Sequence, residues 1–423
     1  GDPQPRAASA TYDNFAYHSL DCCEDLWKDI SEYTSTISGR PVYGMMLGDI
    51  VHENMSLYDN YCKSLAKLNF PFYSVIGNHD NDPTAANDDA GAAYFENNLG
   101  PRNYSFNVGK FHVVVLDNLI MRLNSSGQLK DYDQGLTDDI WKWLQNDLSY
   151  VDYSTPLIVC AHSPMFMIAS GTDRSQTTTT RHGADYALLL SKYKKVYAWA
   201  GHVHNSFNYV YDASSKFPNI EVHTVSRATG ALWINEWLCE DGTPRGYIVA
   251  EADGENLSWK FKPIAYQSKT AVGEVPSYKL RDFTFNADGV AMRGGKKLDA
   301  TYQLRAYPRG TYDDKYVYAN VFMYDEKWGD VKFTSSKNGS AVMSRVTEKN
   351  RKYDAAYKEV FDFYKASGSA LSSSADFKLF DNSGNVATPV THLFRCYSSA
   401  ESDSGTVTVT DRFGNEYSTT VSW

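Results

Sequence analysis

Four short apolar runs in the first half of the chain are each followed at once by polar side chains that bind cations in proteins. These polar segments are Gly48-Asp49, Gly77-Asn78-His79-Asp80, His162 and Gly201-His202-Val203-His204. Carboxylate and amide oxygens suit hard divalent cations, and imidazole suits zinc, iron, manganese or nickel. The residue types therefore predict a metal site rather than four unrelated loops.

A site of this kind can hydrolyse a phosphate ester. One carboxylate such as Asp49 can bridge two cations about 3.5–4 Å apart. A hydroxide held between the two cations exists at neutral pH and can lie in line with a phosphorus atom. We expect His202 and His204, two residues apart in an extended segment, to point the same way.

Alternating helices and strands must position these residues. Helical spacing of apolar residues predicts helices over about 20–37, 57–68 and 137–148. Short apolar runs predict buried strands at 42–47, 72–76, 111–116, 157–161 and 196–200. The pattern indicates an α/β layered domain with a mixed sheet, and ligands bind at the carboxyl ends of strands in such folds.

The sequence pattern changes near residue 275. Apolar and polar residues alternate over 301–307, 316–324, 375–380 and 405–410, with one helical stretch near 352–365. These segments predict a small all-β, sandwich-like domain. We therefore expect one domain over 1–265 and a second over 276–423, with 266–275 as the join.

Length and composition agree with a soluble globular protein of two domains. A chain of 423 residues is longer than one hydrophobic core usually organises. The net charge of −10 argues against a general nucleic-acid binder, although bound cations can invert the local sign for a phosphate substrate. No apolar run is long enough to span a membrane. The six cysteines show no repeated spacing, so we expect free thiols.

The ordered set of motifs, with Asp2-x-Gln4 at the start, resembles the calcineurin-like metallophosphoesterase superfamily. Gln4 in place of His, together with 241–247 and 410–415, is similar to a bacterial subgroup with an appended C-terminal β domain. The resemblance implies a four-layer α/β/β/α sandwich followed by the small all-β domain. It also implies a phosphoric ester hydrolase with two divalent metal ions (Mn, Mg, Fe, Zn or Ca).

The resemblance further assigns roles to residues. One cation would be held by Asp2, Gln4, Asp49 and His204, and the second by Asp49, Asn78, His162 and His202. His79 would stabilise the leaving oxygen and donate a proton to it, with Asp80 orienting its ring. The polar loop past His162 is either a solvated surface loop or a lid whose Arg174 or Arg181 grips a phosphate.

Two departures from the family pattern affect the site. Gln4 replaces an imidazole with a neutral amide oxygen, which favours magnesium, manganese or calcium in the first position. His52 stands where many relatives carry an Asp, so the orientation of a neighbouring ligand is open. Asp2 should end a strand although only Gly1 precedes it, so we expect upstream residues in the native protein.

Three functions stay open at this point. The first is a phosphomonoesterase or phosphodiesterase acting on a small or surface substrate. The second is a weak or inactive relative that binds a glycan or a protein partner at a cell surface. The third is a nuclease, which the acidic balance disfavours. The resemblance to the bacterial subgroup implies a periplasmic or cell-surface location.

Overall fold

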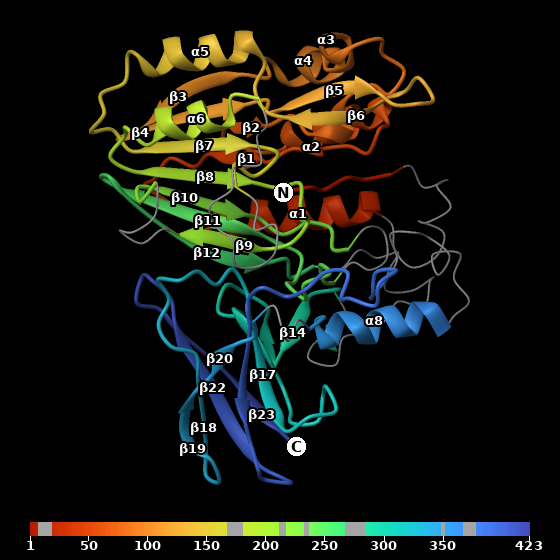
Figure 1. Cartoon of the computed structure of the whole chain (residues 1–423), viewed down its shortest axis with the longest axis vertical. Coiled ribbons are helices and arrows are strands. Elements are labelled where there is room, and N and C mark those ends of the chain that lie inside the picture. Colours follow the sequence, from red (N-terminus) through yellow and green to blue (C-terminus); the bar gives the residue numbers. More distant parts are fainter. Residues whose placement is uncertain are drawn as a thin grey trace.

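The computed structural model describes residues 1–6, 19–166, 181–210, 217–231, 237–266, 284–286, 288–347, 352–366 and 378–423. Stacked helices and strands form the larger part, and a narrower β-rich part lies beneath them (Figure 1). None of the helices in the described ranges is long and apolar enough to cross a membrane.

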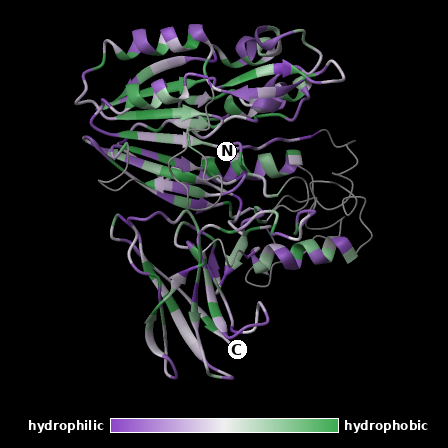
Figure 2. Cartoon of the chain, viewed as in Figure 1, coloured by the Kyte–Doolittle hydropathy of each residue, from purple (hydrophilic) through white to green (hydrophobic). Residues whose placement is uncertain are grey.

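A six-stranded mixed sheet is the centre of the larger part. The strand order is β3-β4-β7-β8-β10-β9, with β4, β7, β8 and β10 parallel and the two edge strands antiparallel. The strands are β3 (Tyr104–Val108), β4 (Phe111–Leu116), β7 (Leu157–Ala161), β8 (Val196–Ala200), β9 (Phe207–Val210) and β10 (Ile220–Thr224). The inner strands are largely buried and hydrophobic (Figure 2), as expected for parallel strands covered on both faces.

A second β layer packs against this sheet. It consists of the parallel pair β1 (Gly44–Met46) and β2 (Phe72–Ser74) and the hairpin of β11 (Gly246–Asp253) and β12 (Asn256–Pro263). A buried cluster that includes Val75, Phe111 and Trp259 fills the space between the two layers. The strands predicted at 42–47 and 72–76 are confirmed, but both are shorter than predicted.

Helices cover the two outer faces. The six-stranded sheet is covered by α5 (Asp138–Leu148) and α6 (Gly183–Leu190), and the second layer by α1 (Ser19–Ser35), α2 (Tyr58–Leu65) and α4 (Ala93–Leu99). The Thr137 hydroxyl accepts from the Ile140 N–H at 3.3 Å and so caps the N-terminus of α5. The predicted four-layer α/β/β/α sandwich is thus confirmed. Its remaining elements are η1 (Met55–Leu57), η2 (Asn78–Asp80), α3 (Asp88–Gly91), β5 (Leu119–Leu123) and β6 (Leu129–Gln134).

The C-terminal part is rich in β-strands, as predicted. One sheet contains β16 (Leu304–Tyr307), β17 (Tyr316–Val321), β21 (Leu393–Tyr397) and β20 (Ser344–Arg345), and the other β19 (Gly339–Val342), β18 (Lys332–Ser335), β22 (Ser404–Thr410) and β23 (Glu416–Ser422). A buried cluster between the two sheets makes this a sandwich. The flanking elements are β13 (Thr284–Phe285), β14 (Ala291–Arg293), β15 (Lys296–Lys297) and α8 (Ala355–Ala366). The strand predicted at 375–380 is wrong over 378–380, where Phe380 forms only an isolated bridge to Val386.

The two parts share one hydrophobic core. Trp237 and Phe261 belong to the same buried cluster as Tyr318, Phe322 and Leu393. The Phe261 and Phe322 rings lie edge to face with centroids 6.3 Å apart. The predicted boundary at 266–275 falls almost entirely outside the described residues and stays a prediction.

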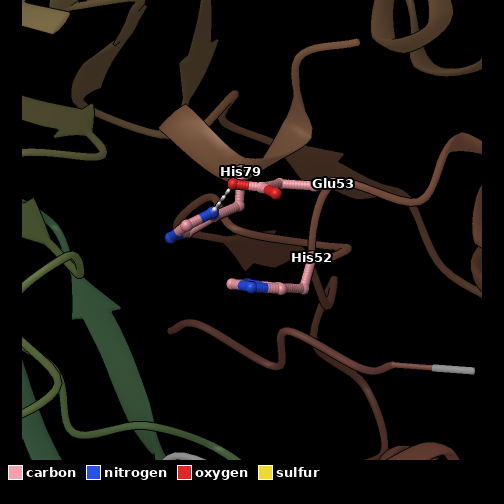
Figure 3. Close-up of side chains that lie close together, drawn as sticks. All are labelled: His52, Glu53 and His79. Atoms are coloured by element: carbon pink, nitrogen blue, oxygen red, sulfur yellow. Dashed lines mark ion pairs between the residues drawn. The ribbon is translucent and has the colours of Figure 1, made fainter. Parts of the chain in front are cut away.

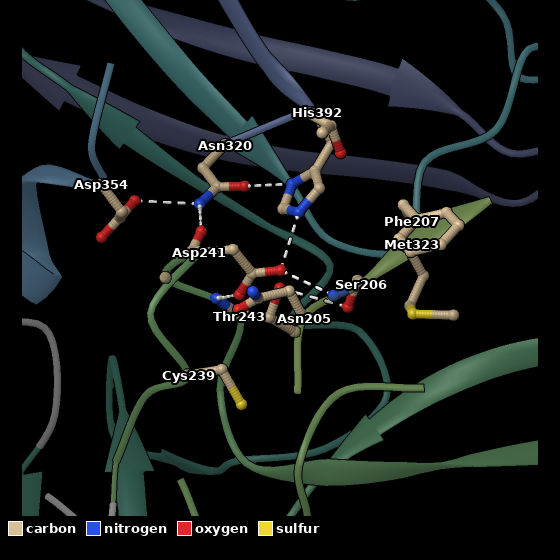
Figure 4. Close-up of polar contacts among 12 residues, drawn as sticks. Asn205, Ser206, Phe207, Cys239, Asp241, Thr243, Asn320, Met323, Asp354 and His392 are labelled. Carbon is tan, nitrogen blue, oxygen red and sulfur yellow. Dashed lines mark hydrogen bonds and ion pairs between the residues drawn. The ribbon is translucent and has the colours of Figure 1, made fainter. Parts of the chain in front are cut away.

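A buried polar network also joins the two parts (Figure 4). The Asp241 carboxylate accepts from the Ser206 N–H at 2.7 Å and lies 3.1 Å from His392 Nε2. The Asn320 amide donates to the Asp241 carbonyl at 2.8 Å and to the Asp354 carboxylate at 2.9 Å. Because Ser206 lies two residues after His204, the last residue of the fourth polar motif, this network links that motif to the C-terminal part.

Glu221 of β10 is the centre of a second junction. Its carboxylate is 1% exposed and pairs with Lys195, with Lys327 at 2.8 Å and with Arg412 at 2.7 Å. Burial alone would raise the pKa of Glu221, but hydrogen bonds from His223 and Arg412 hold it far below its usual range. Since Lys327 and Arg412 come from the C-terminal part, this ion cluster links the two parts.

We predict that Glu221→Gln destabilises the protein by about 3 kcal/mol at neutral pH, because buried cations lose their shared counter-charge. Because the pKa of Glu221 is lower in the folded protein than its ordinary value of 4.5, its charge stabilises the folded state fully above pH 4.5 and progressively less below it. The difference in melting temperature between variant and wild type should therefore shrink below about pH 4.5. Glu255→Gln, which breaks an exposed pair with Lys194, is the control and should leave the melting temperature unchanged. Equal melting temperatures for Glu221→Gln and wild type would contradict the prediction.

Candidate metal centre

Three of the predicted ligands form the buried centre of the site. Asp2, Asp49 and His162 have no exposed surface. His162 Nε2 lies 3.3 Å from Asp49 Oδ2 and 3.9 Å from Asp2 Oδ1. His204 Nε2 also lies 3.9 Å from Asp2 Oδ1. The donor atoms of Asp2, Asp49 and His162 are all within 4.8 Å of one another, which is close enough to bind one ion.

The other predicted ligands adjoin this centre. The Gln4 amide donates to Asp49 Oδ2 at 2.7 Å. His202 Nδ1 lies 3.2 Å from Asn78 Oδ1, and the His202 N–H donates to Asp2 Oδ1 at 2.8 Å. The structure thus brings together all seven residues that the sequence singled out as ligands.

The first four residues are fixed by backbone and side-chain hydrogen bonds. The Gln4 N–H donates to the Asp49 carbonyl at 2.9 Å. The Thr229 hydroxyl donates to the Pro3 carbonyl at 2.9 Å. The fully buried Arg227 guanidinium donates to the carbonyls of Asp2 at 3.2 Å and Gln4 at 3.5 Å. These contacts hold Asp2 and Gln4 in place from two sides.

Five of the seven predicted ligands have strained backbone. Nine non-glycine residues in the described part have positive φ, and five of them are predicted ligands. These five are Asp2 (49°), Gln4 (37°), Asp49 (52°), His202 (69°) and His204 (61°). The expectation of an extended segment at His202 and His204 is therefore wrong, because both residues are left-handed. Such conformations cost about 1–3 kcal/mol each and cluster at functional sites.

Glycines in the motifs leave room for ligands from neighbouring motifs. A Cβ at Gly48 would lie 2.3 Å from His162 Nδ1, and φ of +87° there also favours glycine. A Cβ at Gly201 would lie 2.3 Å from Asp2 Oδ2. Side chains at these two positions would push the ligand groups apart.

The charges of the site call for a cation. Burial and the Asp49 charge raise the pKa of Asp2 to about 6. Burial opposes ionisation of Asp49 and of His162, yet their mutual attraction lowers the pKa of Asp49 and raises that of His162 to about 10. Asp2 Oδ2 is buried without a hydrogen-bond partner among the described residues. A divalent cation would satisfy this oxygen and both carboxylates, so the residues present fit a metal ion.

Two histidines are set up as neutral ligands. Burial and the nearby His162 lower the pKa of His202 to about 3. Burial and Arg227 lower the pKa of His204 well below its usual value. Both imidazoles are therefore unprotonated at neutral pH, which is the form that binds metals.

His79 lies at the edge of the centre beside two residues that follow Gly48-Asp49 (Figure 3). Its Nδ1 lies 3.4 Å from Glu53 Oε1, and its ring is 4.2 Å from that of His52 between centroids. Burial opposes protonation, but the charges of Asp49 and Glu53 raise the pKa of His79. Burial and the adjacent His79 lower the pKa of His52 to about 3, so His79 is the more readily protonated of the two histidines.

Asp80 does not orient the His79 ring, and that prediction is wrong. The Asp80 carboxylate accepts from the backbone N–H groups of Val51 at 3.0 Å and Gly77 at 2.7 Å. It is fully buried and shapes the loop instead. Glu53, the residue after His52, faces the His79 ring instead, with its Oε1 3.4 Å from His79 Nδ1. The sequence signal was a carboxylate one position later than the family pattern places it.

Two further contacts come from β6, which sequence reasoning did not connect to the site. Lys130 Nζ lies 2.5 Å from Glu53 Oε2, and the Tyr132 hydroxyl lies 3.1 Å from His202 Nε2. Their spacing of two residues on a strand was the available signal, but nothing in the sequence located the strand beside the motifs.

The two predicted arginines fare differently from the ligands. Arg174 lies outside the described residues. The exposed Arg181 pairs with Asp138 at the start of α5, at 2.8 Å, and its described contacts include none of the predicted ligands. Phosphate binding by Arg174 or Arg181 stays a prediction.

Family models match the chain in two successive stretches. Residues 1–206 match the model for calcineurin-like phosphoesterase, and residues 223–417 match the model for the C terminal of calcineurin-like phosphoesterase. The chain belongs to the calcineurin-like phosphoesterase family. The appended C-terminal domain predicted from the sequence is confirmed.

Individual relatives of this phosphoesterase are more distant. A probable glycerophosphodiester phosphodiesterase, GpdQ, of Arcobacter nitrofigilis is 27% identical over 192 residues, which span 45% of this chain and 66% of that protein. Purple acid phosphatase PPD1 from yellow lupin (Lupinus luteus) seeds is similar with a TM-score of 0.41 and 18% identity, and the match covers 62% of this chain and 50% of that chain. A putative 5'-nucleotidase from Staphylococcus aureus is similar with a TM-score of 0.33 and 15% identity, and the match covers 68% of this chain and 55% of that chain.

We predict that excess Mn²⁺ raises the melting temperature of the metal-stripped phosphoesterase and that Asp49→Asn abolishes this rise. A ligand at a hundred times its Kd stabilises the native state by about 2.7 kcal/mol. Asp49→Asn should fold without metal, because it removes one of two neighbouring buried carboxylates. Thermal melts with Mn²⁺ or EDTA check this, with the exposed Asp139→Asn as the control that keeps the rise. An equal rise in Asp49→Asn would contradict the assignment.

Proposed function

We propose that this phosphoesterase hydrolyses a phosphate ester with the help of two divalent cations. The observation that supports the proposal best is the convergence of two buried carboxylates, two amides and three imidazoles, with His79 at their edge. A scaffold that only bound metal would need neither the partly exposed His79, whose side chain is 26% exposed, nor the carboxylate beside it.

The family resemblance supports two sets of ligands that share Asp49. Asp2, Gln4, Asp49 and His204 would hold one cation, and Asp49, Asn78, His162 and His202 the other. Bound cations of this kind supply Lewis acidity and an acidified water as the nucleophile. Oxygen donors outnumber imidazoles in the first set, so we propose manganese, magnesium or calcium there in preference to zinc.

His79 would complete the reaction. As the bond from phosphorus to the attacking water oxygen forms, the bond from phosphorus to the ester oxygen breaks. The departing oxygen gains negative charge, and a protonated His79 donates its proton to that oxygen. The products are the phosphate, or a phosphomonoester when the substrate is a diester, and the free alcohol.

The substrate is proposed at the level of chemical class. The name of the Arcobacter relative supports small phosphodiesters as the first compounds to test, with phosphomonoesters beside them. We also propose a periplasmic or cell-surface location for the substrate, as in the resemblance to the bacterial subgroup.

We predict that the Mn²⁺-loaded protein cleaves p-nitrophenyl phosphate or bis-p-nitrophenyl phosphate, and that His79→Ala lowers kcat by about 10²–10⁴ for an alkyl or phenyl phosphate ester. The variant should retain its metal, because His79 is not among the ligands. Steady-state kinetics and elemental analysis test both statements. His182→Ala is the control, since His182 pairs with Asp138 outside the site. Absence of turnover by metal-loaded wild type with every divalent cation would overturn the proposed function.

A further inference from the structure

Strand β6 presents two different faces. Lys130 and Tyr132 are partly buried, whereas Asp131 and Asp133 are exposed. The alternation is that of a strand with one face toward the protein. The inner face of β6 packs against η2, the turn that carries Asn78 and His79.

Lys130 reaches His79 through Glu53. Lys130 Nζ lies 2.5 Å from one Glu53 oxygen, and His79 Nδ1 lies 3.4 Å from the other. The Glu53 N–H donates to the His79 carbonyl at 2.9 Å. Glu53 also has a φ of 55°, a conformation that needs support from its surroundings. The Glu53 carboxylate is therefore fixed between a cation and the imidazole, and the backbone hydrogen bond fixes its distance from His79.

Tyr132 reaches His202 directly. The Tyr132 hydroxyl lies 3.1 Å from His202 Nε2, and the two rings meet edge to face. The other nitrogen, His202 Nδ1, faces the Asn78 amide oxygen at 3.2 Å. Nδ1 thus points toward the other ligands, and Nε2 is left to hydrogen-bond with the hydroxyl. A hydrogen bond on the second ring nitrogen is what fixes the tautomer and orientation of a metal-binding histidine.

We propose that the inner face of β6 positions both histidines for the reaction, His79 by Lys130 through Glu53 and His202 by Tyr132. The proposal rests on the proposed function and deepens it. Lys130, Glu53 and Tyr132 are positioning residues, because they act through His79 and His202 rather than on the substrate. The simpler alternative is that Lys130 and Glu53 form an ordinary surface ion pair, which contributes little to stability and nothing to the reaction.

The leaving group separates these alternatives. A positioned proton donor matters most when the departing oxygen is a poor leaving group. Lys130→Met and Glu53→Gln should lower kcat by about 10–100-fold for an alkyl or phenyl ester and by much less for the p-nitrophenyl ester. Lys130→Arg should restore most of the activity, and Asp131→Asn on the outer face is the matched control. An equal loss for all esters, or no loss, would overturn the role of Lys130 and Glu53.

Metal binding tests Tyr132 without any turnover. Titration calorimetry of the metal-stripped protein with Mn²⁺ should show that the affinity of one site falls about tenfold in Tyr132→Phe. The affinities of both sites should be unchanged in Asp131→Asn. Unchanged affinities in Tyr132→Phe would overturn the role of Tyr132. If wild type cleaved no ester at all, the proposed function would fail, and the calorimetry would still decide whether β6 supports the metal centre.

Discussion

The burial of two neighbouring carboxylates, those of Asp2 and Asp49, is the constraint on which the rest of the site depends. Charges taken out of water need partners of opposite sign, and His162 is one such partner, 3.3 Å from Asp49 and 3.9 Å from Asp2. The left-handed turns, the side-chain-free positions at Gly48 and Gly201, and the Arg227 hydrogen bonds all hold this arrangement together. The local backbone thus keeps two buried carboxylates close together, in an arrangement that fits a positively charged group.

The C-terminal sandwich is part of the same arrangement. Asp241 links the loop after the fourth motif to His392 and Asn320, and Glu221 links β10 to Lys327 and Arg412. Asp241 and Glu221 are both buried, and both come after the fourth polar motif in the chain. The second domain therefore braces the catalytic layer.

The sequence was sufficient to predict the strand ends and the convergence of seven polar side chains, because buried strands with polar termini have a clear pattern and the motifs resemble those of a known family. It was insufficient where tertiary packing decides which of several nearby residues makes a contact. Glu53 rather than Asp80 faces His79, because the turn after His52 is left-handed. Lys130 and Tyr132 come from a hairpin whose location depends on packing, which the sequence pattern does not encode. The shared core between the two parts was missed for the same reason.

That shared core constrains how the protein is made. Trp237 and Phe261 cannot complete their packing until Leu393 has left the ribosome, since all three belong to one buried cluster. Until then the nascent layered domain exposes aromatic surface next to the segment that fixes Asp2 and Gln4. Synthesis of this phosphoesterase thus includes an interval in which the layered domain is present but its packing is incomplete.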